Sequence, residues 1–264
     1  MMELKDKRLF LLDMDGTIYV DNVLIEGTKE FLNYIKSIGG KYIFLTNNSS
    51  KSVDKYIEKL EFLEIKSKKE DFLTSVNATI EHLKKRNYKK IYSFGTASFV
   101  EQLCKADLPV TTQMCDDIDC LCIGFDTEIT FKKIEDACIL LTRGVDYIAT
   151  NPDWVCPTRY GFVPDCGSVV QMLYNATKRT PHFIGKPQPE MVYLAMKATG
   201  FRPEETVIIG DRLYTDIACG VNAGISSVLV LSGEGTMEDV KKSEIKPQFI
   251  YNNIKELYLD LQIE

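Results

Sequence analysis

Three polar side chains come directly at the end of apolar runs of the chain: Asp13, Thr46 and Asp211. In an open parallel sheet the carboxyl ends of the strands meet at one edge, and ligands bind there. If the apolar runs are neighbouring strands, these side chains converge, and Lys186, in a loop before a helix, could join them. Two aspartates at one point repel each other unless a cation lies between them, and carboxylate oxygens suit Mg²⁺.

Such a group of residues is suited to the transfer of a phosphoryl group. Lys186 brings a positive charge for phosphate oxygens, and Thr46 and Asn47 could donate hydrogen bonds to the same anion. Asp13 could attack as a nucleophile and form an aspartyl phosphate, whose charge Mg²⁺ and Lys186 would balance. Asp15, two residues further on, could protonate the leaving oxygen as a general acid and then activate water as a general base.

The elements that must position these residues follow from the hydrophobic pattern. Short apolar runs alternate with amphipathic segments, which predicts βαβ units and a mainly parallel sheet. We expect strands at 8–12, 42–45, 91–94, 119–123, 146–149, 182–184, 207–209, 227–231 and 248–251. We expect helices at 28–37, 52–63, 74–86, 97–105, 131–143, 189–200 and 216–223.

Composition narrows the class of protein. The 264 residues, 45% hydrophobic and 27% charged, suit one large α/β domain or a core with a smaller inserted domain. The net charge of -6 argues against binding to nucleic acid or to an anionic membrane. No apolar run approaches a membrane span or the hydrophobic region of a signal peptide, so we expect a cytoplasmic protein. The 8 cysteines contain no CxxC pair and, with 2 histidines, do not predict a zinc site; we expect most of them, Cys166 included, to be inert.

Four motifs now resemble a known family. Asp13-Met-Asp15-Gly-Thr resembles the DxDGT signature of the haloacid dehalogenase-like (HAD) superfamily. The segment Leu-Thr46-Asn-Asn-Ser is similar to its second motif, Gly-Lys186-Pro to its third, and 210–216, GDRLYTD, to its fourth. The motifs occur in the family's order. The LTNNS and GKPQPE forms and the long insert between them resemble the NagD-like, p-nitrophenyl-phosphatase branch.

The resemblance implies a fold, a cofactor and residue roles. It implies a Rossmann-like parallel-sheet core, 1–88 and 181–264, with an inserted α/β cap of the C2 type at 89–180. It implies a Mg²⁺-dependent phosphatase acting on a small phosphorylated metabolite, with dimerisation through the cap. The implied metal site consists of Asp13, the Asp15 carbonyl group, Asp211 and, through water, Asp216. The implied phosphate site consists of Thr46, Asn47, Asn48 and Lys186. Cap residues near the leaving group would be Asn151, Asp153 and Trp154.

Other interpretations stay open at this point. Asp13 and Asp15 could be turn residues, Thr46 to Ser49 a helix cap, and 151–153 a simple turn. A phosphotransferase could use the same fold, although 30 residues between Asp15 and Thr46 leave no room for the helical cap of the related mutases. A non-catalytic phosphometabolite-binding protein is the alternative from another class. Sugar phosphates, nucleoside monophosphates, phosphoglycolate, pyridoxal phosphate and glycerol phosphate are all possible substrates.

Overall fold

The computed structural model describes residues 3–158 and 160–263 and separates into two compact units. We call Met1–Thr46, Asp54–Leu73 and Lys186–Glu264 the core unit, and Asn47–Val53 with Thr74–Gly185 the inserted unit. The predicted domain limits at 88/89 and 180/181 stay a prediction, because the two units are groups of residues in mutual contact and need not coincide with domains. The chain passes between the units four times, at 46–47, 53–54, 73–74 and 185–186.

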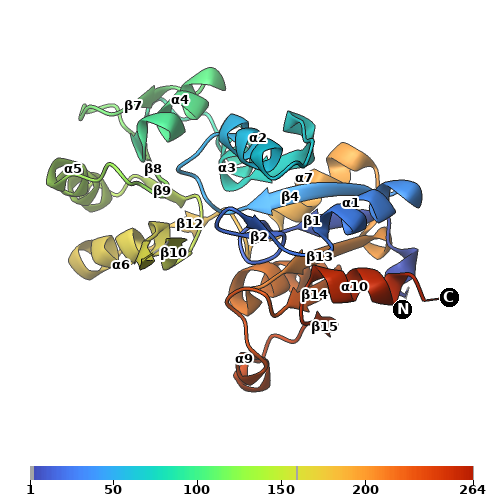
Figure 1. The fold of residues 1–264 in the computed structure, drawn as a ribbon. Helices are drawn as coiled ribbons and strands as arrows, with labels where there is room; N and C mark the ends of the chain where they lie inside the picture. Colours follow the sequence, from blue (N-terminus) through green and yellow to red (C-terminus); the bar gives the residue numbers. More distant parts are fainter. Residues whose placement is uncertain (1–2, 159, 264) are drawn as a thin grey trace. The chain divides into compact units, whose positions relative to one another are not determined.

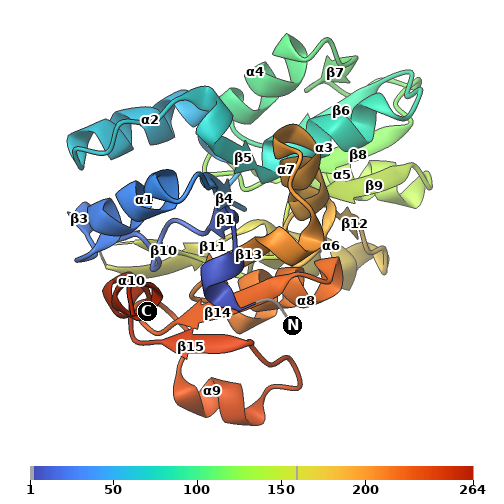
Figure 2. The same cartoon turned by 90° about the vertical axis from the view of Figure 1, so that its right-hand side faces the viewer.

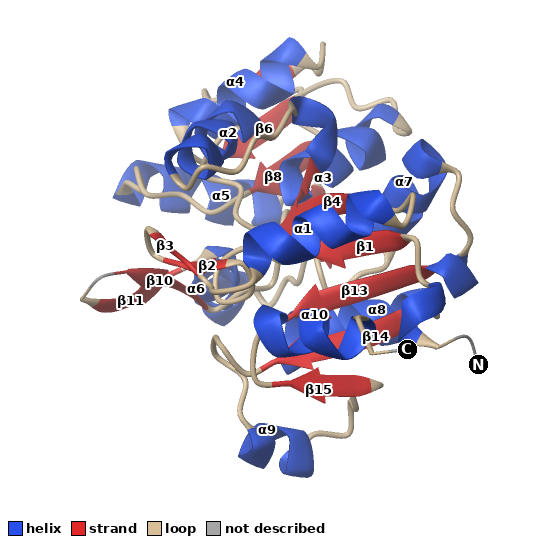
Figure 3. Ribbon diagram, turned by 45° about the vertical axis from the view of Figure 1, so that its right-hand side comes forward, coloured by secondary structure: helices blue, strands red, loops and turns tan. Residues whose placement is uncertain are grey.

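The core unit is built on a six-stranded sheet with the order β15-β14-β13-β1-β4-β5. The strands are β1 (Leu9–Leu12), β4 (Lys41–Thr46), β5 (Phe72–Thr74), β13 (Thr206–Gly210), β14 (Ser226–Val230) and β15 (Phe249–Tyr251). The pairs from β15 to β4 are parallel. The chain adds β4 on one side of β1 and β13 on the other, so the strand order reverses beside β1, where α/β sheets bind their ligands. Figure 3 shows β4, β1, β13, β14 and β15 lying side by side.

Two pairs of helices cover this sheet (Figures 2 and 3). On one face α1 (Thr28–Ser37) packs against α10 (Ile254–Leu261), and on the other α7 (Glu190–Thr199) packs against α8 (Ala218–Ala223). Helix α1 buries Phe31, Leu32 and Ile35, a spacing that puts all three on one side. Phe31 meets Phe10 of β1 edge to face, at 5.6 Å between ring centroids. The unit also contains α2 (Val53–Phe62), α9 (Met237–Lys242) and the hairpin β2 (Tyr19–Val20) with β3 (Val23–Leu24).

The inserted unit has an α/β core of its own (Figure 1, green to yellow). Its sheet has the order β12-β9-β8-β6-β7, formed by β6 (Ile91–Phe94), β7 (Val110–Thr111), β8 (Cys120–Ile123), β9 (Asp146–Ala149) and β12 (His182–Phe183). Its helices are α3 (Ser75–Lys84), α4 (Ala97–Lys105), α5 (Phe131–Thr142) and α6 (Cys166–Thr177), and β10 (Val155–Thr158) pairs with β11 (Gly161–Pro164) as a hairpin. Leu121, Leu140 and Leu173 are among the side chains of its buried cluster.

The predicted fold class is confirmed, and the differences are local. The hydrophobic pattern missed α6, α9, α10, the strands β5 and β7, and the two hairpins. Helix α6 had a signal, since Asp165 caps its first turn and Val169, Val170 and Leu173 recur at helical spacing. The helix predicted at 216–223 begins at Ala218 instead, after a π-helical turn over Leu213–Ile217. No helix in the described part of the chain is long and apolar enough to cross a membrane.

Candidate active site

Two neighbouring strands place two aspartates at one edge of the core sheet. Leu12 of β1 lies opposite Ile209 of β13, so Asp13 and Asp211 each follow the last residues of paired strands. The Asp13 N–H donates to the Ile209 carbonyl oxygen at 2.9 Å, which fixes the backbone at this point. Thr46 is the last residue of β4, the other neighbour of β1, and lies buried at the same edge.

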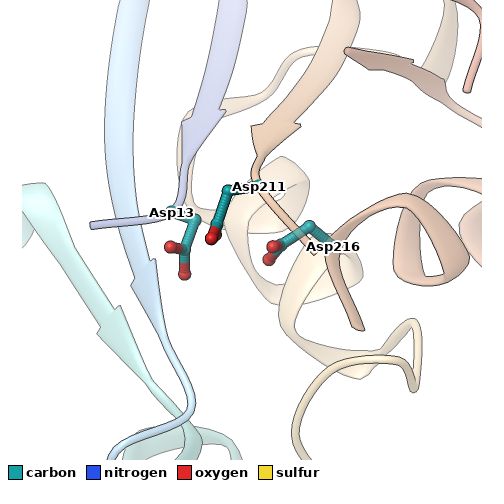
Figure 4. A group of neighbouring side chains, drawn as sticks. All are labelled: Asp13, Asp211 and Asp216. Carbon is teal, nitrogen blue, oxygen red and sulfur yellow. The ribbon is translucent and has the colours of Figure 1, made fainter. Parts of the chain in front are cut away.

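Asp216 reaches the same point from the π-helical turn. Its Oδ2 accepts a hydrogen bond from the Arg212 N–H at 3.1 Å, which closes the turn. Gly210 leaves room for this carboxylate, because a Cβ at position 210 would lie 2.2 Å from the Asp216 Cγ. Asp13, Asp211 and Asp216 each offer an oxygen, and these oxygens all lie within 4.8 Å of one another. Figure 4 shows the three carboxylates, two of them at strand ends and the third from the turn.

Lys186 supplies positive charge to this cluster. Its Nζ lies 2.5 Å from Asp13 Oδ1 and 2.6 Å from Asp216 Oδ1, and it also donates to the Leu45 carbonyl oxygen at 3.3 Å. The side chains of Lys186 and Asp216 are 3% and 1% exposed, whereas that of Asp13 is 15% exposed. The one carboxylate of these two ion pairs that keeps an open side is therefore Asp13.

The three carboxylates of this cluster carry more negative charge than the Lys186 ammonium group balances. Burial raises the pKa of Asp13 well above its usual range; Lys186 opposes this rise, and the charges of Asp216 and Asp211 reinforce it. Burial, followed by the charge of Asp216, raises the pKa of Asp211 to about 7. Burial alone would lower the pKa of Lys186, but its two aspartate partners raise it, so the lysine stays charged.

The residues present fit a divalent cation. Asp211 is 2% exposed, and its Oδ1 has no hydrogen-bond partner among the described residues, while its Oδ2 accepts from the Glu234 N–H at 2.7 Å. A buried carboxylate oxygen without a partner costs free energy unless a ligand satisfies it. Gly16 and Gly233 enclose this carboxylate, since a Cβ at either would come within 2.5 Å of Asp211 Oδ2. The three carboxylates form an oxygen-donor set of the kind that Mg²⁺ prefers. The one ammonium group beside them, that of Lys186, balances part of their charge.

Asp15 does not belong to the cluster of the three carboxylates. Its side chain is 46% exposed, and it contacts the Tyr19 hydroxyl group at 3.3 Å and the Lys59 Nζ at 3.6 Å. The pattern of the sequence singled out neither Tyr19 nor Lys59. Lys59 lies on α2, outside the four motifs.

The other predicted site residues belong to the inserted unit, where Asn47, Asn151 and Asp153 contact one another. The Asn47 Nδ2 donates to Asp153 Oδ1 at 3.0 Å, and the Asn47 carbonyl oxygen accepts from Asn151 Nδ2 at 2.8 Å and from the Ser75 hydroxyl group at 2.6 Å. Asn151 and Asp153 are buried, whereas Trp154 is 52% exposed. Sequence reasoning missed Ser75, whose neighbour Thr74 gives the usual signal of a helix cap instead.

Asn48 uses both ends of its side-chain amide, and its Nδ2 donates to Cys156 Sγ at 3.9 Å. Its Oδ1 accepts from the Ser50 N–H at 2.9 Å and from the Ser50 hydroxyl group at 2.7 Å. The phosphate-binding roles of Asn47 and Asn48, and the leaving-group role of Asn151, Asp153 and Trp154, stay predictions. Cys166 is buried, and burial raises the pKa of its thiol to about 12, which keeps it protonated near neutral pH.

Comparisons with known proteins agree on one family. Residues 10–109 match the model of the haloacid dehalogenase-like hydrolases, and residues 183–257 match a second HAD-hydrolase-like model. An acid sugar phosphatase from Staphylococcus aureus is 30% identical over 260 residues, 98% of this chain and 100% of the relative.

Solved structures extend this likeness over nearly the whole chain. The 4-nitrophenylphosphatase from Thermotoga maritima is 38% identical, with a TM-score of 0.92 and coverage of 98% of this chain and 99% of that one. The glycerol phosphate phosphatase from Mycobacterium tuberculosis, in complex with magnesium, is 26% identical, with a TM-score of 0.91 and coverage of 99% and 80%.

Proposed function

The chain belongs to the haloacid dehalogenase-like hydrolases, in their NagD-like, p-nitrophenyl-phosphatase branch, and we propose that it hydrolyses small phosphate monoesters, sugar and polyol phosphates first among them, with Mg²⁺ as its cofactor. The names of the similar acid sugar phosphatase and glycerol phosphate phosphatase support this substrate class. The phosphatase class does not depend on the choice among sugar, polyol and nucleoside phosphates.

One observation carries the proposal: Lys186 holds Asp13 at 2.5 Å beside two buried carboxylates at the end of the core sheet. In this arrangement Asp13 is the nucleophile, because it is the more open carboxylate and Lys186 fixes it through Oδ1. Asp13, Asp211 and Asp216 would hold Mg²⁺, with the Asp15 carbonyl group as a further ligand. The bound cation supplies positive charge that stabilises the transferring phosphoryl group.

The residues of the chain then divide the reaction into two steps. A carboxylate oxygen of Asp13 attacks phosphorus, the bond from phosphorus to the ester oxygen breaks, and Asp15 gives that oxygen a proton. Water next attacks the aspartyl phosphate, Asp15 takes the proton, and phosphate leaves with Asp13 restored. Lys186 keeps its charge because Asp13 and Asp216 contact it, and Asp216 remains a carboxylate while Asp13 carries the phosphoryl group. Thr46, with Asn47 and Asn48, would donate hydrogen bonds to the phosphoryl oxygens.

The location and partners of the enzyme complete the proposal. A cytoplasmic location agrees with the 8 free cysteines, since thiols stay reduced in the cytosol. The partner is a small phosphorylated metabolite, with no nucleic acid or membrane involved, and the homodimer through the inserted unit remains part of the proposal.

The test is phosphate release from p-nitrophenyl phosphate and a panel of phosphorylated metabolites, with Mg²⁺ and with chelator. Asp13→Asn is the matched variant, because it keeps the shape of the side chain and removes the nucleophile. We expect release that requires both Mg²⁺ and Asp13. Transfer of the phosphoryl group to an added alcohol in place of water would favour a phosphotransferase. Tight binding of a metabolite without release would favour the non-catalytic binding protein.

A further inference from the structure

Among the core-unit residues assigned to the reaction, Asp15 has the most exposed side chain. It follows β1 outside any strand or helix, and its side chain is 46% exposed. The backbone around it is fixed, since the Gly16 N–H donates to the Tyr19 carbonyl oxygen at 2.8 Å. The carboxyl group itself can still rotate, and an exposed side chain exchanges rotamers on the picosecond to nanosecond scale. A general acid must instead stay within hydrogen-bond reach of the oxygen that it protonates.

Tyr19 contacts one oxygen of this carboxyl group from the buried side. The Tyr19 ring is 0% exposed, and its hydroxyl group donates to Asp15 Oδ2 at 3.3 Å. Burial and the nearby charge of Asp15 raise the pKa of Tyr19, so the hydroxyl group keeps its proton. Because the ring cannot move in the core, its hydroxyl group is a fixed donor.

Lys59 contacts the other oxygen. Its Nζ lies 3.6 Å from Asp15 Oδ1 and 3.6 Å from the centroid of the Tyr19 ring, a cation–π distance. The Lys59 side chain is 23% exposed, so most of its surface is covered by neighbouring residues. Lys55, one turn earlier on α2, pairs instead with Glu58, and both of those side chains are more than 60% exposed. Lys59 therefore differs from its neighbour in direction as well as in burial.

From this geometry we propose that Tyr19 and Lys59 are positioning residues, which together hold the Asp15 carboxyl group in the direction of the leaving-group oxygen. Tyr19 binds Oδ2 and also carries the Lys59 ammonium group on its ring face, and Lys59 in turn binds Oδ1. The inference rests on the proposed function, in which Asp15 is the general acid and base, and it adds two residues that no motif of the sequence includes.

Positioning of a general acid has a distinct kinetic signature. When the ester bond breaks, the leaving oxygen takes its electron pair and receives the proton of Asp15. An alkoxide, such as the one from glycerol phosphate, is strongly basic and needs this proton. The p-nitrophenolate ion is weakly basic and departs without it. Loss of position therefore slows hydrolysis of alkyl phosphates far more than hydrolysis of p-nitrophenyl phosphate.

The test measures kcat/KM of the full-length Mg²⁺ enzyme on both esters, together with kcat and KM. The ratio kcat/KM reports the first step, in which the leaving group departs, whereas the second step acts on the same aspartyl phosphate for both esters. Lys59→Met keeps the apolar stem and removes the charge, Lys59→Arg keeps the charge, and Tyr19→Phe removes only the hydroxyl group. Since general acid catalysis is worth about 10²- to 10⁴-fold, we expect Lys59→Met to lower kcat/KM on glycerol phosphate by about 10- to 100-fold and on p-nitrophenyl phosphate by less than about 3-fold. Lys59→Arg should regain most of the loss, and Tyr19→Phe should show a smaller loss with the same preference. Lys55→Met is the control on the same helix and should leave both esters unaffected.

A double-mutant cycle with Asp15→Asn tells whether Lys59 acts through Asp15 or contacts the substrate itself. If Lys59 acts through Asp15, adding Lys59→Met to Asp15→Asn changes kcat and KM on p-nitrophenyl phosphate by less than about 2-fold, because nothing remains to be positioned. A KM that still rises in the double variant would mean that Lys59 contacts the substrate, and would overturn the inference. Equal losses of kcat/KM on both esters would overturn it too, as the result of a structural defect. A wild-type enzyme that is inactive on every ester would instead refute the proposed function, and the inference with it.

Discussion

Replacing Asp211 by Asn should make the metal-free enzyme more stable and should remove its response to Mg²⁺. The Asn side chain has the same shape, so its carbonyl oxygen can still accept from the Glu234 N–H, as Asp211 Oδ2 does at 2.7 Å. Its NH₂ group would then replace Asp211 Oδ1, which has no hydrogen-bond partner among the described residues. A repulsion between carboxylates becomes a possible hydrogen bond to Asp13 or Asp216.

The size of the effect follows from the pKa of Asp211. Burial and the charge of Asp216 raise it from 3.8 to about 7, and at 1.36 kcal/mol for each unit this corresponds to up to about 4 kcal/mol at pH above 7. The unfolded chain loses this proton near pH 4, while the folded protein keeps it up to about pH 7. The wild type therefore loses stability as pH rises from 4 to 7, and Asp211→Asn should not. At about 2–4 °C per kcal/mol, the metal-free variant should melt up to about 16 °C higher at pH 8.

Thermal unfolding in chelator, at pH 5 and pH 8, measures this difference. A Mg²⁺ titration follows, in which the wild type should gain about 2.7 kcal/mol at a hundredfold excess over Kd and the variant almost nothing. Asp136→Asn is the control, because Asp136 is also buried but has its partners, Lys132 Nζ at 2.8 Å and the Tyr92 hydroxyl group at 3.0 Å. That variant should be less stable than the wild type. A lower melting temperature for metal-free Asp211→Asn, with an intact gain from Mg²⁺, would refute the reasoning.

Three further predictions test other contacts. Lys186→Met should lower the stability of the metal-free protein by about 3–5 kcal/mol, because it leaves the carboxylates of Asp13 and Asp216 without their cation. Denaturant unfolding in chelator measures this loss, and an unchanged midpoint would contradict the prediction. Asp153→Ala should raise KM by a similar factor for every ester, because it releases the Asn47 side chain; a changed ranking of esters in steady-state kinetics would instead place Asp153 at the leaving group. Burial and the charge of His182 lower the pKa of His82 to about 4, so the stability of the protein should fall as pH falls from 6.5 to 4. Denaturant unfolding should show a smaller fall in His82→Gln. An equal fall in the wild type and the variant would rule this out.

Local patterns predicted the elements with a clear period. The strands at 91–94 and 146–149 and the helices at 28–37 and 97–105 have the predicted limits. Periodicity failed where elements are short or irregular, as in the hairpins, which contain strands of 2 to 4 residues. It also placed Asp216 in a regular helix, whereas the residue lies in a π-helical turn that the glycine at 210 permits.

The sequence by itself determined the fold class, the family and the residue types at the strand ends, because buried parallel strands and catalytic turns leave local patterns that do not depend on distant neighbours. Only the tertiary structure decided which other residues contact these strand-end side chains and their neighbours. Lys59 reaches Asp15 from helix α2, and Asp153 and Asn151 bind Asn47 from more than 100 positions away in the chain. Such contacts depend on how elements pack and in which direction each side chain leaves the backbone, and no spacing along the chain encodes either.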